Sequence, residues 1–466
     1  MHNTILNQYC SWLSPMSNRI LFGTNGIRGI VNEELTPEFV TEVGIAVGTY
    51  FNAGNILIGC DSRTSSILFT RSAVSGLASA GCNIYEVGYA PTPAIQFAVK
   101  HFKMDGAVII TASHNPPEYN GIKVVAGDGV EIPREEEVKI EETFFKKKFS
   151  RRKWNELGKA VSFPGILDVY KEAIKKHIDS EAIREKNFKV VIDPANSVGA
   201  LVTPYLLREL GCSVITINAQ LDGNFPGRLP EPKPKTLGGL AKTVRATGAD
   251  LGIAHDGDAD RCFFVDELGN ICLGDKTGTI IIDYILQRFP NSVVVTPISS
   301  SRMLEDIVKR RGSELLWTEV GSTMVSKRMK EVNSVIGMED NGGIFYAPHQ
   351  PVRDGALASA LMLEVLANSN RTLSQMIDQL PKYFIIKERI DCPNERKQKV
   401  LEKLLKQTEN YRRITVDGVK VFFEDGSVLM RPSGTEAIYR VYVEAKDEER
   451  AREIANWGIS LVEENL

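Results

Sequence analysis

Short apolar runs alternate with amphipathic stretches along most of the chain. Apolar residues dominate 55–59, 106–110, 189–192 and 293–295, and residues 65–80 and 204–210 show apolar positions at helical spacing. Strands that alternate with helices are typical of parallel-rich α/β layers with helices on both faces. The pattern therefore predicts an α/β protein whose ligands bind beyond the carboxyl ends of its strands.

Charged and polar stretches mark the expected domain boundaries. Pro133 and three glutamates open a helix that ends near the lysines of 146–148, and a charged segment that we interpret as a solvated linker follows up to Trp154. The last segment holds strands around 421–423 and 428–430 and a closing helix from about Asp447. At roughly 150 residues per domain, a chain of 466 residues fits three domains or four smaller ones. We place four, at 1–155, 156–265, 266–370 and 371–466.

Composition narrows the function classes. The chain is 43 % hydrophobic and 25 % charged, and its formal charge of −3 gives no support to a nucleic-acid binder. Seven cysteines without a Cys-x-x-Cys pair argue against a zinc ribbon or a disulfide scaffold and favour a reducing cytoplasm. No apolar run reaches the roughly 18 residues of a membrane helix. Residues 1–18 lack Lys and Arg, unlike a signal peptide, and we expect a loosely attached leader there.

A serine loop follows the apolar run 106–110. It reads Thr111-Ala-Ser-His-Asn-Pro-Pro-Glu-Tyr-Asn-Gly-Ile-Lys123. Ser113 is a candidate nucleophile or phosphoryl carrier, His114 is its neighbour, and Lys123 can neutralise a phosphate. No Gly-x-Ser-x-Gly elbow surrounds Ser113, which argues against a hydrolase triad. A Ser-His pair alone is also compatible with an ordinary polar loop.

An aspartate loop follows the strand expected at 251–254. Asp256, Asp258 and Asp260 alternate in a compact turn before Arg261. Three convergent carboxylates suit Mg²⁺, which prefers oxygen ligands and often binds a substrate phosphate as well. A calcium loop is a poor match, because Arg261 stands where that motif requires glycine. A solvated acidic turn remains the alternative when this loop is considered alone.

Two further loops can bind polar ligands. Residues 337–343 follow an apolar pair and include Glu339 and Asn341, although such a sequence also fits an ordinary glycine-rich turn. Residues 431–436 follow the strand at 428–430 and offer Arg431, hydroxyl groups and exposed N–H groups that can form an anion nest. A helix-capping turn with surface arginines is the alternative for this second loop.

Together these motifs resemble those of the α-D-phosphohexomutases over nearly the whole chain from Leu21 onward. The resemblance implies three related α/β domains with mixed sheets and a smaller C-terminal α+β domain around a central cleft. It implies that Ser113 carries a phosphoryl group, and that one Mg²⁺ is bound by one phosphoserine oxygen and by Asp256, Asp258 and Asp260. Arg261 would sit beside the transferring group.

The same resemblance assigns the substrate contacts. Glu339 and Asn341, which stands where many members have Ser, would bind the 3- and 4-hydroxyls of a sugar. Gly343 stands where many members carry a histidine that is sometimes proposed as a general acid/base. The distal phosphate would be held by the family's phosphate loop, here Arg431, Ser433, Gly434, Thr435 and Arg440.

The opening motif 22–29 completes the resemblance. Its Arg28 would support the phosphoserine region. Asn25 and Ser322 depart from the pattern, because relatives often have Asp at both positions. Residues 61–63 match a further signature that we interpret as mainly structural.

The implied reaction has two phosphoryl transfers through a bound sugar bisphosphate, which would also serve as activator. The opening and closing motifs resemble phosphoglucosamine mutases, so the expected reaction interconverts glucosamine 6-phosphate and glucosamine 1-phosphate. Residues 116–123 and 339–343 look like archaeal-type members, which include phosphomannomutase/phosphoglucomutase enzymes, and that activity is the alternative. A metal-dependent sugar phosphatase is an alternative from another class, and the oligomeric state is left open. The expected partners are small sugar phosphates, without nucleic acid or membrane.

Overall fold

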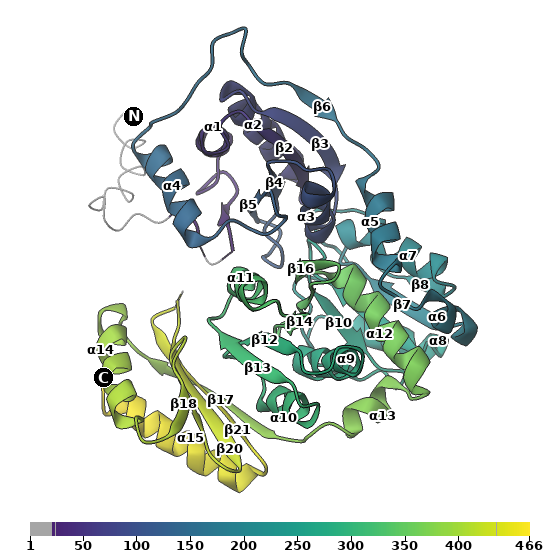
Figure 1. Ribbon diagram of the computed structural model, residues 1–466, viewed down its shortest axis with the longest axis vertical. Helices are drawn as coiled ribbons and strands as arrows, with labels where there is room; N and C mark the ends of the chain where they lie inside the picture. Colours follow the sequence, from purple (N-terminus) through teal and green to yellow (C-terminus); the bar gives the residue numbers. More distant parts are fainter. Residues whose placement is uncertain (1–20, 24, 435) are drawn as a thin grey trace.

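The computed structural model describes residues 21–23, 25–434 and 436–466 (Figure 1). The expected leader at 1–18 and Thr435 lie outside these residues. Four sheets succeed one another along the chain, the first three mixed and the last antiparallel. The expected fold class, three α/β units followed by a smaller α+β unit, is confirmed.

The first sheet has helices on both faces. Its strand order is β1-β5-β4-β2-β3-β6, with bounds β1 Ile27–Ile30, β2 Asn55–Cys60, β3 Asn83–Tyr89, β4 Gly106–Ile110, β5 Tyr119–Ala126 and β6 Ala160–Ser162. The helices are α1 Pro37–Tyr50, α2 Ser66–Ser79, α3 Thr92–His101 and α4 Arg134–Phe145. One core gathers residues of α1, α2 and α4, and a second gathers residues of α3. Strand β4 and residues 56–60 of β2 are buried and without polar side chains, because both faces of these strands are covered.

The second sheet has the order β11-β10-β9-β7-β8. Its strands are β7 Lys189–Asp193, β8 Ser213–Thr216, β9 Leu251–His255, β10 Cys262–Val265 and β11 Ile271–Cys272. The accompanying helices are α5 Ile166–Lys175, α6 Ser180–Lys186, the 3-10 helix Val198–Leu201, α7 Thr203–Glu209 and α8 Gly238–Thr247. The aspartate loop is the turn between β9 and β10, which pair as an antiparallel hairpin.

The third sheet has the order β13-β12-β14-β15-β16. Its strands are β12 Val293–Pro297, β13 Glu314–Thr318, β14 Ile336–Met338, β15 Ile344–Tyr346 and β16 Gln350–Arg353, and its helices are α9 Gly274–Arg288, α10 Arg302–Arg310, α11 Ser322–Val332, α12 Gly355–Ser369 and α13 Leu373–Asp378. Helix α12 is buried along nearly its whole length and contacts α6 and α7 as well as α9. One hydrophobic core therefore joins the second and third units.

The fourth sheet is antiparallel, with the order β17-β21-β20-β19-β18. Its strands are β17 Phe384–Asp391, β18 Arg412–Ile414, β19 Val419–Phe422, β20 Gly426–Pro432 and β21 Ile438–Ala445, with helices α14 Asn394–Gln407 and α15 Glu448–Glu463. It has a separate core. Arg302 of α10 fastens it to the third unit by donating to the carbonyls of Phe423, Gly426 and Glu424 at 2.5–2.9 Å.

The expected domain limits at 155, 265 and 370 stay a prediction. Two short strands follow an expected limit in the sequence but belong to the sheet of the preceding unit. Strand β6, beyond residue 155, extends the first sheet, and β11, beyond residue 265, extends the second. Both are sheet-edge strands of two or three residues, which hydrophobic patterning cannot assign to a sheet.

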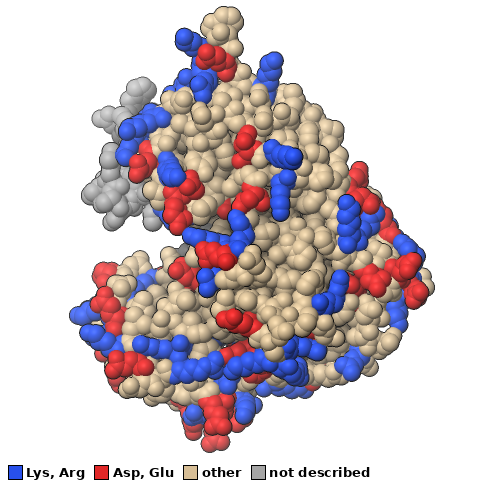
Figure 2. Space-filling model, in the orientation of Figure 1, with Lys and Arg blue, Asp and Glu red and all other residues tan. Residues whose placement is uncertain are grey.

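The first and last units face each other across an opening at the left of Figures 1 and 2. Behind it lies a cavity of about 750 Å³ lined by residues of α4, of α11 and of the last unit, including Arg431. In the part of the chain that the structure describes, no helix has the length and hydropathy that crossing a membrane requires.

Candidate active site

Ser113 lies directly beyond the carboxyl end of β4 and is completely buried. Its backbone is left-handed, with φ of 50°, a conformation that non-glycine residues adopt mainly in turns and functional sites. Its N–H donates to Thr111 Oγ1 at 2.9 Å. Its hydroxyl donates to Asp256 Oδ2 at 2.8 Å, so the serine loop of the first unit meets the aspartate loop of the second.

Arg63 holds the serine loop in this shape. Its guanidinium donates to four loop carbonyls, those of Ser113, Asn115, Pro116 and Tyr119, at 2.5–2.9 Å. Asp61 accepts from Arg63 Nε at 3.1 Å and from Thr111 Oγ1 at 2.6 Å. The interpretation of 61–63 as mainly structural agrees with these contacts, which fix the backbone of the loop that carries Ser113. The position of Asp61 directly after β2, the parallel neighbour of β4, is the sequence signal for this role.

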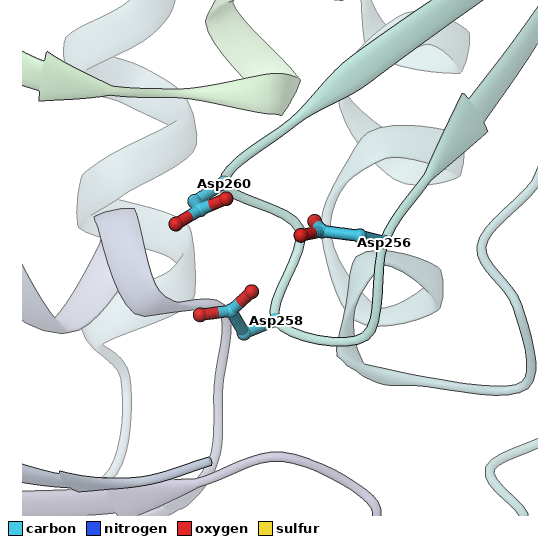
Figure 3. A group of neighbouring side chains, drawn as sticks. All are labelled: Asp256, Asp258 and Asp260. Carbon is cyan, nitrogen blue, oxygen red and sulfur yellow. The ribbon is translucent and has the colours of Figure 1, made fainter. Parts of the chain in front are cut away.

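The three aspartates converge. One carboxylate oxygen from each aspartate lies within 4.8 Å of those of the other two, and Figure 3 shows all three side chains pointing toward a common centre. All three are buried. Burial, followed by repulsion from Asp260 and Asp258, raises the pKa of Asp256 well above its ordinary value. Asp258 Oδ1 and Asp260 Oδ1 are buried and find no hydrogen-bond partner within the described chain. Unpartnered carboxylate oxygens at this spacing fit a hard divalent cation.

Three cations surround the aspartates. Lys123 Nζ lies 3.0 Å from Asp258 Oδ2 and 3.4 Å from Asp260 Oδ2. Burial alone would lower the pKa of Lys123, but the nearby carboxylates outweigh it and raise the pKa. Arg261 is farther away, 3.7 Å from Asp256. The third is Arg353 at the end of β16, whose Nη2 lies 2.5 Å from Asp260 Oδ2. The motifs did not reveal Arg353, because it reaches the site only through the fold of the third unit.

His114 and Arg28 contact residues of the serine loop. His114 Nδ1 is 3.4 Å from Ser113 Oγ. Burial, together with the charges of Arg261 and Arg28, lowers the pKa of His114 to about 2, so the ring is neutral. Arg28 Nη1 donates to Asn115 Oδ1 at 2.6 Å, while Arg28 Nε and Nη2 are buried and meet no hydrogen-bond partner among the residues described. A buried guanidinium with two nitrogens that lack hydrogen-bond partners in the described structure can bind a phosphate group on the neighbouring Ser113.

Residues 339–343, which the family resemblance leads us to expect at a sugar and which we call the sugar loop, connect β14 to β15. Glu339 is 2 % exposed, and its Oε2 lies 3.2 Å from Arg353 Nη1. Burial raises the pKa of Glu339, and the charge of Arg353 opposes this shift. Glu339 N–H donates to the Gly343 carbonyl at 2.8 Å, and Asn341 Oδ1 accepts from Gly343 N–H at 3.2 Å. The loop is thus closed on itself and tied to the aspartate loop through Arg353.

The phosphate loop shows a row of arginines. Arg389, Arg440 and Arg431 are paired across neighbouring strands β17, β21 and β20. Directly opposite residues of antiparallel strands project from the same face, so this row concentrates positive charge. Arg431 pairs with Asp417 at 2.9 Å, and Arg440 pairs with Glu436 at 2.6 Å. Arg389 was missed because only strand pairing brings it beside the motif.

The rest of the phosphate loop is supported from α14. Lys397 Nζ donates to the carbonyls of Ser433 and Glu436 at 2.5 and 2.6 Å. Ser433 Oγ accepts from Glu436 N–H at 3.2 Å, and Gly434 is exposed. Thr435, the remaining expected contact, lies outside the described residues.

The two departures from the usual acids meet in space. Ser322 Oγ, at the start of α11, donates to Asn25 Oδ1 in the opening loop at 2.9 Å. This contact joins the first unit to the third. Two aspartates at these positions would place like charges together, whereas Asn and Ser form a neutral hydrogen bond.

The structure thus brings together Ser113, its two neighbours His114 and Lys123, Arg28, Arg261 and the three aspartates. Glu339 joins them through Arg353. Arg431 and Arg440 pair with acids of their own unit, on the far side of the cleft.

Comparisons with known proteins give one consistent result. Models of the phosphoglucomutase/phosphomannomutase α/β/α domains I, II and III match residues 19–151, 168–269 and 273–384, and the model of the C-terminal domain matches 388–456. A "phosphoglucomutase/phosphomannomutase" of Thermococcus kodakarensis is 46 % identical over 454 residues, covering 96 % of this chain and 99 % of the relative. A "phosphoglucosamine/phosphogalactosamine mutase" of Sulfurisphaera tokodaii is 44 % identical over 450 residues, covering 95 % and 99 %. The crystal structure of a phosphoglucomutase/phosphomannomutase family protein from Burkholderia thailandensis superposes with a TM-score of 0.87 at 25 % identity, covering 96 % of this chain and 97 % of that one.

Proposed function

The chain belongs to the phosphoglucomutase/phosphomannomutase family of phosphohexomutases, which are isomerases, and we propose that it interconverts glucosamine 6-phosphate and glucosamine 1-phosphate through a phosphorylated Ser113. The observation that carries this proposal is the contact of 2.8 Å between Ser113 Oγ and Asp256 inside a buried cluster of carboxylates and cations. A phosphoryl group on that oxygen would lie between Arg28 and the aspartates.

The chain's own residues would share the transfer as follows. Phospho-Ser113 gives its phosphoryl group to a free sugar hydroxyl, so that one P–O bond breaks at Ser113 and another forms on the sugar. The proton that the sugar hydroxyl loses is balanced by the proton that Ser113 Oγ gains. The bound bisphosphate then turns around, and its other phosphoryl group returns to Ser113. Lys123, Arg28 and Arg261 offset the charge of the moving group, since phosphoryl transfer depends mainly on positioning and electrostatics.

Asp256, Asp258 and Asp260 would hold one Mg²⁺, which neutralises charge on the transferring phosphoryl oxygens when bound. The unpartnered oxygens of Asp258 and Asp260 support this assignment. Burial, followed by the charges of Arg261 and Arg28, lowers the pKa of His114 to about 2. Its Nδ1 lies 3.4 Å from Ser113 Oγ, so we give it the role of a polar neighbour that positions this oxygen.

The amino-sugar assignment rests on several weaker observations. The opening and closing motifs resemble phosphoglucosamine mutases, and the printed name of the Sulfurisphaera relative refers to amino sugars. Asp340, next to Glu339, is half-buried and offers a carboxylate that would favour an ammonium at C2. Burial raises the pKa of Asp340, and the charge of Lys387 opposes this shift. The Thermococcus relative supports phosphomannomutase/phosphoglucomutase activity as the second candidate.

Two experiments test the function. Peptide mass spectrometry after incubation with a labelled sugar bisphosphate should find the label on Ser113, and Ser113→Ala should take up no label and lose turnover. Turnover without any label on Ser113 would show that the carrier is another residue. Stoichiometric release of inorganic phosphate in place of a sugar 1-phosphate would identify a phosphatase.

Competition among glucosamine, mannose and glucose 6-phosphates, with Mg²⁺ and a trace of bisphosphate, then tests the substrate. We expect the highest kcat/KM for the amino sugar. A mannose or glucose phosphate that turns over about tenfold better, a difference of roughly 1.4 kcal/mol in activation free energy, would replace the amino-sugar proposal with the second candidate.

A further inference from the structure

Gly343 is small because Arg353 passes directly over it. A Cβ atom added at Gly343 would lie 2.5 Å from Arg353 Cδ and 2.9 Å from its Cγ. Gly343 is absent from the glycines with positive φ, so its backbone conformation is open to other residues. The side chain that many family members carry here, a histidine by resemblance, would collide with Arg353.

The guanidinium of Arg353 ends between two functional loops. Its Nη2 lies 2.5 Å from Asp260 Oδ2, and its Nη1 lies 3.2 Å from Glu339 Oε2. The side chains of all three residues are no more than 3 % exposed. A planar guanidinium can engage two carboxylates at fixed angles, which the single ammonium of lysine cannot do.

We propose that Arg353 is a positioning residue that couples the sugar loop to the aspartate loop, and that it occupies the space which a side chain at position 343 takes elsewhere in the family. The inference rests on the proposed function for the roles of Asp260 and Glu339. Arg353 and Lys123 both hold Asp260 Oδ2. Oδ1 of the same carboxylate makes no hydrogen bond to the described residues and has Arg261 Nε, at 3.9 Å, as an ionic neighbour. A cation can therefore bind at Oδ1. Arg353 likewise holds Glu339 Oε2, which fixes the orientation of this carboxylate in the sugar loop.

Such a residue makes the two binding events interdependent. A sugar phosphate that orders Glu339 also orders Arg353 and Asp260, so it should tighten Mg²⁺ binding, and Mg²⁺ should tighten sugar binding by the same factor. Loss of a residue that orients a metal ligand typically weakens metal affinity 10–100-fold. A residue with only a packing role would not link the two affinities.

The test measures binding rather than turnover. Mg²⁺ affinity is measured by calorimetry on the full-length protein without and with saturating glucosamine 6-phosphate, or with whichever hexose 6-phosphate the wild type binds best. In the wild type the sugar phosphate should tighten Mg²⁺ binding. In Arg353→Lys, which keeps the charge, Mg²⁺ affinity should fall about 10–100-fold and the tightening should disappear.

A double-mutant cycle of positions 343 and 353 tests whether a side chain at 343 and the side chain of Arg353 compete for one space. Gly343→Ala should displace Arg353 and reproduce a large part of the same loss. Arg353→Ala removes Cγ and Cδ, so Gly343→Ala should add nothing in that background. Gly238→Ala is the matched control, because a Cβ there meets nothing within 4 Å, and it should bind Mg²⁺ like the wild type. Arg353→Gln replaces Arg353→Ala if the alanine variant does not fold, as judged by circular dichroism.

The possible results distinguish failure of the Arg353 proposal from failure of the proposed mutase function. A wild type that binds neither Mg²⁺ nor any hexose phosphate would overturn both. A wild type that binds both, with an Arg353→Lys variant that keeps the same Mg²⁺ affinity and the same tightening, would overturn the coupling alone. Full additivity of Gly343→Ala and Arg353→Ala would show that the two residues do not share one space.

Discussion

The two sides of the cleft differ in how their charged residues are paired. The reaction side, around Ser113 and the aspartates, is held by contacts between units, whereas the phosphate side, around Arg431 and Arg440, is paired within its own unit. On the reaction side, residues from the first two units contact one another directly: Ser113 with Asp256 at 2.8 Å and Lys123 with Asp258 at 3.0 Å, all nearly inaccessible to solvent. On the phosphate side, Arg431 and Arg440 are partly exposed and paired with Asp417 and Glu436 of their own unit.

This difference has a chemical meaning. Preorganised charges stabilise a transition state without rearranging during the reaction, which suits the side where bonds change. Arginines paired with their own acids must exchange a carboxylate for a phosphate when substrate binds. Changes on the reaction side should therefore lower kcat, and changes on the phosphate side should raise KM.

The largest effect is expected for Asp258→Asn. The variant removes one of three convergent carboxylates and the nearest of the ionic partners of Lys123. Loss of cation binding should reduce kcat by about a thousandfold, or roughly 4 kcal/mol in activation free energy. Asp168→Asn, a neutralisation at a side chain 83 % exposed on α5, is the control and should retain full activity. Undiminished turnover of Asp258→Asn in excess chelator would contradict the metal assignment.

Arg63→Lys should make the serine loop on the reaction side less rigid and so reduce the difference between the two sides. An ammonium cannot reach the four carbonyls that the guanidinium holds, so Ser113 would lose its fixed position. A displacement of about 1 Å can lower a rate about a hundredfold, so kcat should fall by that order while KM changes little.

Arg302→Lys is the matched comparison, since Arg302 also clamps carbonyls but at the base of the last unit. It should raise KM more than it lowers kcat. Steady-state kinetics of both variants decide the point, and equal effects on kcat would show that the two sides of the cleft are not functionally distinct.

Arg440→Ala tests whether the phosphate side contributes to substrate binding rather than to phosphoryl transfer. Losing a charge-assisted hydrogen bond to the non-reacting phosphate costs about 1.5–3 kcal/mol, so affinity for sugar phosphate should fall about tenfold to a hundredfold. Labelling of Ser113 by bisphosphate at saturation should persist. Arg452→Ala is the control, because the side chain of Arg452 on α15 is largely exposed. An affinity that does not change in Arg440→Ala would place the phosphate site elsewhere.

The sequence predicted the parts of the site that consist of local motifs. The alternation of Asp256, Asp258 and Asp260 in a turn after an apolar strand was enough to predict their convergence, because a tight hairpin turn has few conformations. Ser113 could be placed at a strand end for the same kind of reason. That the two loops meet is a contact between units, which the residue pattern could not give and only the family resemblance implied.

Residues that act through tertiary contacts were not predictable. Arg353 reaches Asp260 from β16, and Arg389 joins Arg440 only through strand pairing, so neither belongs to a recognisable motif. Arg63 lies in a motif that the sequence marks as structural, but its contacts could not be predicted, because its four acceptors are backbone carbonyls that leave no trace in side-chain patterns. The roles of these residues stay predictions until the variants above are measured.

The smallest effect concerns the contact that joins the first unit to the third. Ser322 Oγ donates to Asn25 Oδ1, and each residue replaces an aspartate that is frequent in relatives. Asn25→Asp alone keeps a hydrogen-bond acceptor for the hydroxyl. Ser322→Asp alone leaves Asn25 able to donate through its amide, and an acid at the first turn of α11 interacts favourably with the helix dipole. Each single variant should therefore stay within about twofold of the wild-type KM, a difference of roughly 0.4 kcal/mol.

The double variant places two carboxylates together and should show an unfavourable coupling of up to about 1 kcal/mol, or up to about fivefold in KM, that shrinks as salt is added. A double-mutant cycle at low and high salt measures this coupling. Additive effects at low salt would mean that the two side chains do not face each other when substrate is bound. In that case substrate binding separates the first unit from the third, and the reaction side is less rigid than its contacts indicate.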